Sequence, residues 1–352
     1  MGYLILALFI ITIALALVQK RISKQRLFLY AILCVILILI AGLRPVGIDP
    51  DSSNYEYTFL HHDDANALDG VEYSYIFLSQ VLSFFTQDVH IIFLFYATLG
   101  VGIKFYALRK LNDLYFIPII VYLGYYFVMH ECMQIRTGVL SALFLLALKY
   151  IGDGDKKKAS ILILIGTLFH YSGLLLVPFL FLSNKILNKK KRLLWASSII
   201  GAYTLAIIGF TLLFNNVDLP YIGNKLALYQ QAMERGKSVN SINLLGIRDL
   251  LSVILYIYLL LFYDSLSIKN RYFPLMMKIY TISLFVYITF SFFPVLAQRT
   301  YMLYNTLTII LYSNIYHTFK QKWIGTLAVA FIAFIYLNYS LPNVETFLLW
   351  KY

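Results

Sequence analysis

Residues 27–43 read LFLYAILCVILILIAGL, a run of apolar and small residues with no charge between Arg26 and Arg44. A helix needs about 20 apolar residues to cross a bilayer, within a range of roughly 17–25. Similar runs recur along the chain, of which 61% is hydrophobic and 13% charged, with a mean hydropathy of +0.75. Soluble domains are roughly 45–50% apolar and about 25% charged. The composition therefore excludes a soluble or disordered protein and predicts an all-α, polytopic membrane protein.

We expect about ten membrane-spanning helices in a single transmembrane domain, residues 1–352, because no Gly/Ser-rich or Pro-rich linker divides the chain. The first run has no basic flank before it and no small-residue cleavage site after it, so it is interpreted as a retained span rather than a signal peptide. The expected spans are 3–18, 27–43, 90–108, 115–130, 136–151, 193–214, 248–263, 272–293, 300–317 and 323–340.

The charged loops predict the orientation of the spans, because Lys and Arg accumulate on the cytoplasmic side of membranes. The net charge of +12 is concentrated in short loops between apolar runs, which favours a membrane over a nucleic-acid partner. Loops 44–89 and 215–247 are expected outside, as is the short turn at His130 and Glu131. The basic segments expected in the cytoplasm are 19–26, 104–110, 156–158, 185–192, 269–271 and 320–322.

Segment 159–182 has basic clusters on both flanks, which one ordinary span would place on opposite sides of the membrane. It is interrupted in the middle by His170-Tyr171-Ser172-Gly173. We therefore favour two half-length helices that enter the membrane and return, an arrangement tolerated where the backbone is buried in protein or lines a cavity. The alternative is a single span that violates the charge rule.

Ionisable residues at the ends of apolar segments are costly and are therefore candidates for function. Arg44, Arg136 and Arg299 lie at the ends of different segments on the expected outer face, where they could converge on one anionic group. The planar fork of Arg suits phosphate, since it forms paired charge-assisted hydrogen bonds. The alternative is that some of these side chains reach lipid headgroups or pair with acidic residues, as we expect for Arg248 beside Asp249.

Three residues are candidates for acid–base chemistry on the same face: His170, Asp49 and Glu72. An imidazole titrates near neutral pH and suits proton transfer, although a buried His bonded to a carbonyl is an equal alternative for His170. Asp49 follows a Gly-containing turn and is otherwise explained by turn formation. Glu72 is the weaker candidate, and the neighbouring His and Asp residues at 61–64 are interpreted as solvated loop residues.

The order of these short motifs resembles the EpsG/Wzy-type polysaccharide polymerases of bacterial envelopes. The resemblance covers residues 40–305, and each motif in it is short. The matching pieces are Gly42-Leu43-Arg44-Pro45-Val46-Gly47-Ile48-Asp49 with Tyr55, Glu72 with Tyr75, Gln134-Ile135-Arg136, the Lys-rich loop at 156–158, Phe169-His170-Tyr171-Ser172 and Gln298-Arg299-Thr300-Tyr301.

The resemblance implies an enzyme that joins oligosaccharide repeat units of O-antigen, capsule or exopolysaccharide on the outer face of the bacterial cytoplasmic membrane. Donor and acceptor would both be linked to undecaprenyl diphosphate, and a flippase and a chain-length regulator would be further partners. No metal, nucleotide or other cofactor is needed, because the donor carries its own activation. An O-antigen ligase, a lipid-linked oligosaccharide flippase or other transporter, and a membrane O-acyltransferase are the alternatives.

Overall fold

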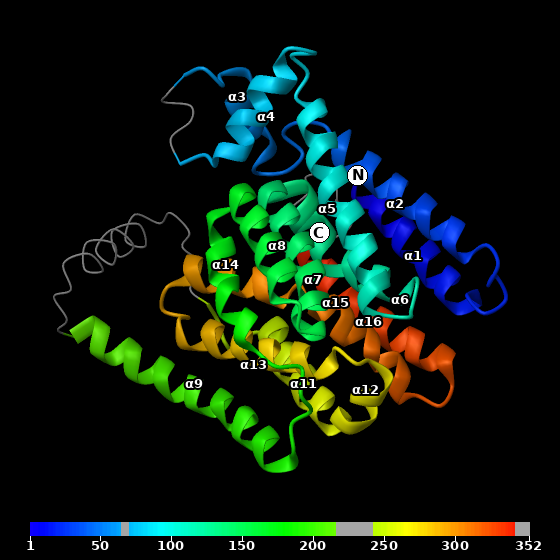
Figure 1. The fold of residues 1–352 in the computed structure, drawn as a ribbon, viewed down its shortest axis with the longest axis vertical. Coiled ribbons are helices and arrows are strands. Elements are labelled where there is room, and N and C mark those ends of the chain that lie inside the picture. The colour runs from blue at the N-terminus through cyan, green and yellow to red at the C-terminus, as the bar shows by residue number, and fades with distance from the viewer. Residues whose placement is uncertain (65–69, 216–241, 342–352) are drawn as a thin grey trace, which may run out of the picture. The chain divides into compact units, whose positions relative to one another are not determined.

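The computed structural model describes residues 1–64, 70–215 and 242–341, and within these ranges it contains helices and no strands (Figure 1). The chain divides into two compact units. The first comprises Met1–Asn184, Asp264–Leu275 and Thr306–Tyr352, and the second comprises Lys185–Tyr263 and Met276–Asn305. The single-domain organisation expected from the sequence stays a prediction.

Several helices of the first unit follow the expected apolar runs, but the expected span 300–317 is broken into the helices Pro294–Asn305 and Thr308–Asn314, which belong to different units. The helices in the N-terminal half of the first unit are α1 (Gly2–Val18), α2 (Arg26–Gly42), α3 (Ser52–Leu60), α4 (Tyr73–Ser83), α5 (His90–Leu111), α6 (Ile117–Val121) and the π-helix η1 (Tyr122–Met133). They are followed by α7 (Ile135–Asp153), α8 (Lys156–Phe169), the 3-10 helix η2 (Tyr171–Phe181), α12 (Tyr263–Lys269), α15 (Thr308–Asn314), η3 (Ile315–Thr318) and α16 (Lys322–Ser340).

Helix α5 is central to the first unit and packs against α2 and α7. Gly42 at the end of α2 permits a close approach, because a Cβ there would collide with Leu94 of α5. Helix α7 ends at Asp153 and is capped by Gly154, whose φ of 84° is left-handed and suits a residue without a side chain. Asp155 then caps α8 by accepting a hydrogen bond from the backbone N–H of Lys158 at 3.1 Å.

The second unit contains α9 (Lys189–Asn215), α11 (Ile247–Leu261), most of α13 (Phe273–Thr289) and α14 (Pro294–Asn305). Its helices are joined by aromatic hydroxyl groups. Tyr280 donates to the carbonyl of Ser252 at 2.7 Å, and Tyr301 donates to the Ser252 hydroxyl at 2.9 Å. Most of the external loop expected at 215–247 lies outside the described residues.

The helices carry the surface of a membrane protein, with large apolar side chains exposed along their outer faces. Examples are Phe28, Val35, Leu164, Ile200 and Phe331. Among the described residues, three helices are long and apolar enough to cross a membrane, namely α5, α7 and α16. A fourth is counted if α11 and α12 form one broken span. Other apolar helices, among them α1, α2 and α13, are shorter. The expected number of about ten spans stays a prediction.

Segment 159–182 contains the break that its flanking charges predicted. Helix α8 ends at Phe169, His170 has an extended backbone with φ −156° and ψ 125°, and η2 begins at Tyr171. The two helices pack against each other. The Nζ atom of Lys156, at the start of α8, lies 5.4 Å from the ring centroid of Phe181, at the end of η2. The chain therefore returns to the level at which it started, as a helical hairpin with His170 at its tip.

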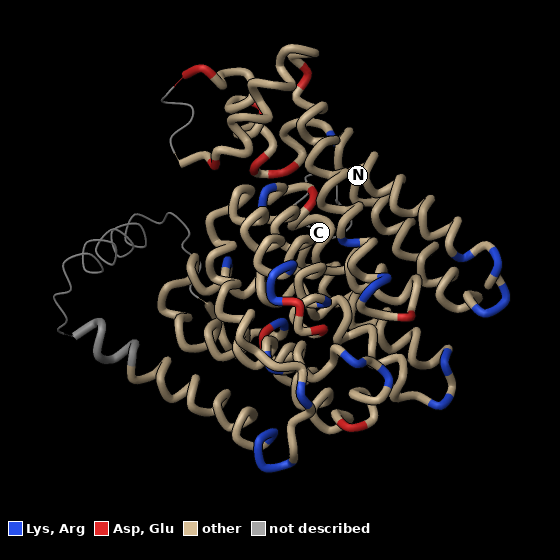
Figure 2. The backbone as a smooth tube through the Cα atoms, in the orientation of Figure 1, with Lys and Arg blue, Asp and Glu red and all other residues tan. Residues whose placement is uncertain are grey.

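Charges are separated along the first unit (Figure 2). Acidic residues gather around α3 and α4, and others lie at the end of α7 and in α12, whereas the loop between α1 and α2 and the start of α16 carry Lys and Arg. Which side of a membrane each group of charges faces stays a prediction.

Candidate functional site

Glu72 and Arg136, which are 64 residues apart in the sequence, form an ion pair in the first unit. Glu72 precedes α4, and its carbonyl accepts the first hydrogen bond of that helix from Tyr75 at 2.9 Å. Arg136 is the second residue of α7. The side chain of Glu72 is 6% exposed and that of Arg136 is 22% exposed. The pair is therefore largely enclosed, with the guanidinium group on the accessible side.

His170 joins this pair from the tip of the α8–η2 hairpin. Its Nε2 atom lies 3.7 Å from Oε1 of Glu72, whose other oxygen contacts Arg136. Its Nδ1 atom accepts a hydrogen bond from the backbone N–H of Ser172 at 3.2 Å and lies 2.8 Å from the Ser172 hydroxyl. Because a backbone N–H can only donate, the neutral imidazole carries its proton on Nε2, facing the carboxylate. We call Glu72, Arg136 and His170 the polar triad.

Aromatic rings line the interior beside the polar triad. The Arg136 guanidinium lies 5.7 Å from the ring centroid of Tyr55 in α3, within the range of a cation–π contact. From there Tyr55, Tyr75 and Tyr96 follow one another at centroid distances of 5.6 and 5.9 Å, and Tyr96 contacts Phe169 at 5.9 Å. Burial raises the pKa of the Tyr55 hydroxyl, an effect that Arg136 opposes. The triad is thus backed by a packed aromatic wall.

Arg44 and Asp49 form a second ion pair, at 3.1 Å, and both side chains are fully buried. Arg44 also donates to the carbonyl of Ala41 at 2.6 Å, and its guanidinium lies 4.0 Å from the ring centroid of Phe93. Asp49 accepts the backbone N–H groups of Asp51 and Ser52. The pair therefore fixes the turn that leads from α2 into α3, the local role that the sequence offered as the alternative for Asp49.

Arg299 belongs to α14 of the second unit and is exposed. Its convergence with Arg44 and Arg136 stays a prediction. Arg248 behaves as expected, since its Nε lies 3.3 Å from Asp249. The hydroxyl of Tyr287 donates to the same carboxylate at 3.1 Å.

The structure corrects the sequence analysis at Lys104 and Glu131, which were expected in a cytoplasmic segment and in an external turn. Both are buried, and the Lys104 ammonium donates to Glu131 and to the carbonyl of Gly138, each at 2.6 Å. The Tyr122 hydroxyl also donates to Glu131 at 2.9 Å. The sequence did show a charged residue, Lys104, within an expected span, but it gave no indication that Glu131 is its partner.

Two comparisons relate the chain to known proteins. The family model described as the EpsG family matches residues 27–352. The amylovoran biosynthesis protein AmsC of Erwinia amylovora is 22% identical over 323 residues, which cover 86% of this chain and 83% of AmsC. No solved structure matches the chain significantly. The resemblance inferred from the motifs is therefore confirmed.

Proposed function

The chain belongs to the EpsG family, and from this membership we propose that it is a membrane glycosyltransferase that polymerises oligosaccharide repeat units into an envelope polysaccharide. The donor is a chain on undecaprenyl diphosphate and the acceptor is a second lipid-linked unit, both presented at the outer face of the cytoplasmic membrane. The amylovoran biosynthesis relative supports the polysaccharide product, and the apolar helices support a lipid-linked substrate.

The observation that carries the proposal is the polar triad, which joins three separate segments of the first unit around one partly accessible guanidinium group. In the reaction, a hydroxyl oxygen of the acceptor attacks the anomeric carbon of the donor. The bond from that carbon to the diphosphate oxygen breaks, and the diphosphate leaves with the bonding electrons. A positioned cation lowers the barrier because it stabilises the charge that develops on the leaving group.

Arg136 is the residue best placed to hold the diphosphate. Its Nε atom is buried and has no hydrogen-bond partner among the described residues, so the fork has a donor to spare. When a diphosphate takes over the guanidinium, Glu72 loses its counter-ion and becomes more basic. It can then accept the proton of the acceptor hydroxyl, while His170 directs its Nε2–H toward the other oxygen of the same carboxylate.

The complete burial of Arg44 and Asp49 gives them a positioning role in this scheme rather than direct contact with substrate. Arg299 is retained as a second diphosphate ligand, because it is exposed and its motif matches the family resemblance.

Polymer length in cells tests the proposal. Arg136→Ala should reduce chain extension by about 100–1000-fold, the usual effect of removing one charge-stabilising donor, and leave single repeat units on gels of the extracted glycan. Arg136→Lys keeps the charge but not the fork and should be intermediate. Arg21→Ala, in an exposed loop, is the matched control.

Because Arg136→Ala leaves Glu72 without its counter-ion, the double variant Arg136→Ala/Glu72→Gln separates misfolding from lost chemistry. It should melt like the wild type and still produce single units. A normal ladder of chain lengths in either variant would refute the diphosphate-binding role.

A further inference from the structure

A second polar site lies at the opposite end of the first unit, where α5 ends, α7 approaches its C-terminus and α12 leads into α13. These segments enclose a pocket of about 490 Å³. Four Lys or Arg residues and a single Asp, Asp113, line it, together with His317 and Asn112. The basic lining residues are Lys110, Lys149, Lys269 and Arg271.

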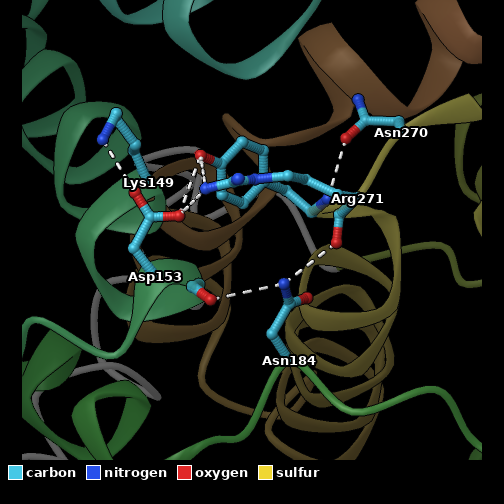
Figure 3. A network of polar contacts seen from close by, with 7 residues as sticks. Lys149, Asp153, Asn184, Asn270 and Arg271 are labelled. Atoms are coloured by element: carbon cyan, nitrogen blue, oxygen red, sulfur yellow. Dashed lines mark hydrogen bonds and ion pairs between the residues drawn. The ribbon is translucent and has the colours of Figure 1, made fainter.

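A network of polar contacts joins the end of α7 to the loop after α12, and it pairs one carboxylate with two cations (Figure 3). Asp153 contacts Arg271, accepts from Lys149 at 2.7 Å and accepts from the Tyr272 hydroxyl at 3.0 Å. Asn184 donates to the carbonyl of Arg271 at 2.9 Å. These contacts fix the loop 270–272 against the end of α7.

Two other lining residues carry charge that no described carboxylate neutralises. Lys110 and Lys269 are exposed, and neither forms an ion pair with a carboxylate among the described residues. The Lys110 ammonium instead lies 5.1 Å from the ring centroid of Tyr106. Two ammonium groups thus border the pocket with one acidic residue, Asp113, beside them.

Asn112 is an independent sign that the pocket takes an acceptor. It is 7% exposed, and its Oδ1 atom accepts the backbone N–H of Leu114 at 2.8 Å, which leaves the NH₂ group as the donor to be satisfied. That Nδ2 atom is buried and has no partner within the described ranges. A buried donor without a partner costs about 1–3 kcal/mol, so an unmatched amide in a basic pocket indicates a place for an anionic oxygen.

We propose that this pocket binds a phosphate-bearing anion, held by Lys110, Lys269 and the amide of Asn112. The pocket lies where the long helices end and where the sequence predicts the cytoplasmic side. Basic pockets between membrane helices at that level bind phosphate headgroups of anionic lipids. A soluble phosphate compound offers the same oxygens, and the experiment below separates the two sources. This site shares no residue with the polar triad.

Native mass spectrometry of the delipidated full-length protein, titrated with dioctanoyl phosphatidylglycerol or inorganic pyrophosphate, tests the proposal. Each surface Lys contributes about a fivefold gain in binding of an anionic lipid. The double variant Lys110→Gln/Lys269→Gln should therefore bind about 30-fold more weakly, equivalent to about 2 kcal/mol. Lys24→Gln/Lys320→Gln removes the same charge from exposed loops and should change binding far less.

Two further variants keep the test independent of folding. Asn112→Asp preserves the acceptor for Leu114 but replaces the donor by a negative charge, and it should abolish binding. Asp113→Asn removes the opposing charge and should tighten binding about fivefold. Binding of the lipid alone identifies a headgroup site, and binding of pyrophosphate as well identifies a phosphate site open to water. Absence of both, or equal losses in the pocket variant and the loop control, would overturn the proposal.

Discussion

Replacing Lys104 by Met should strongly destabilise the first unit, because it leaves the buried carboxylate of Glu131 without its cation. At 2.6 Å the two charges attract by about 6 kcal/mol at an effective dielectric constant of about 20. The Tyr122 hydroxyl remains as a partner of Glu131, so the net cost should approach the 3–5 kcal/mol typical of a broken buried pair. At roughly 2 °C per kcal/mol for a chain of this size, the melting temperature should fall by about 6–10 °C.

Thermal melting of the purified protein in detergent measures this fall, with Lys24→Met in an exposed loop as the matched control. The double variant Lys104→Met/Glu131→Gln removes both charges and should recover at least half of the loss, because no ion is then left buried. If Lys104→Met melted within about 1 °C of the wild type, or if the double variant were no better than the single one, the pair would not clamp α5 to η1 and α7 as argued.

Three other outcomes are expected. Arg44→Ala should cost about 3–5 kcal/mol in melting experiments, because Asp49 would remain buried without its cation, and Arg44→Leu/Asp49→Asn should cost less. Ser172→Cys, in a background lacking Cys34 and Cys132, should react with a membrane-impermeant thiol reagent added to intact cells, and protection until the cells are opened would contradict an outward-facing hairpin tip. The Asp88 carboxylate accepts hydrogen bonds from the backbone N–H of His90 and from its ring, which hold the pKa of this carboxyl below its usual range. The stability that these hydrogen bonds contribute is therefore present above about pH 4 and is lost as the pH falls through the lowered pKa. Asp88→Asn should therefore flatten the acid limb of the melting temperature plotted against pH.

The helices and the break at His170 could be predicted because their causes are local. Apolar runs flanked by charges specify where helices begin and end, and two basic flanks around 159–182 leave a hairpin as the arrangement that satisfies the charge rule. The ion pair of Arg44 with Asp49 is local as well, since five residues separate its members.

The partners within the polar triad and within the buried pair of Lys104 with Glu131 could not be predicted, because they depend on which helices pack together. Glu72 reaches Arg136 across 64 residues and Lys104 reaches Glu131 across 27. The sequence analysis wrongly assigned Lys104 to a cytoplasmic segment, because a Lys near the end of an apolar run resembles a residue that flanks a span. Space for the buried carboxylate comes from Gly100, where a Cβ would collide with Glu131, and this requirement has no signature in a single sequence.

The two candidate sites of the first unit are connected by the same pair of helices. Helix α7 carries Arg136 at its start and Lys149 near its end, about 20 Å apart at 1.5 Å per residue. Helix α5 begins at His90, whose ring lies 3.0 Å from the carbonyl of Arg44, and ends beside Lys110. Because both helices have the length and composition of membrane spans, the polar triad and the basic pocket must face opposite sides if these helices cross. The buried pair of Lys104 with Glu131 lies between the two sites and joins α5 to η1. Because the two sites face opposite sides, a reagent that reaches the Ser172→Cys variant from one side should reach the Lys269→Cys variant only from the other.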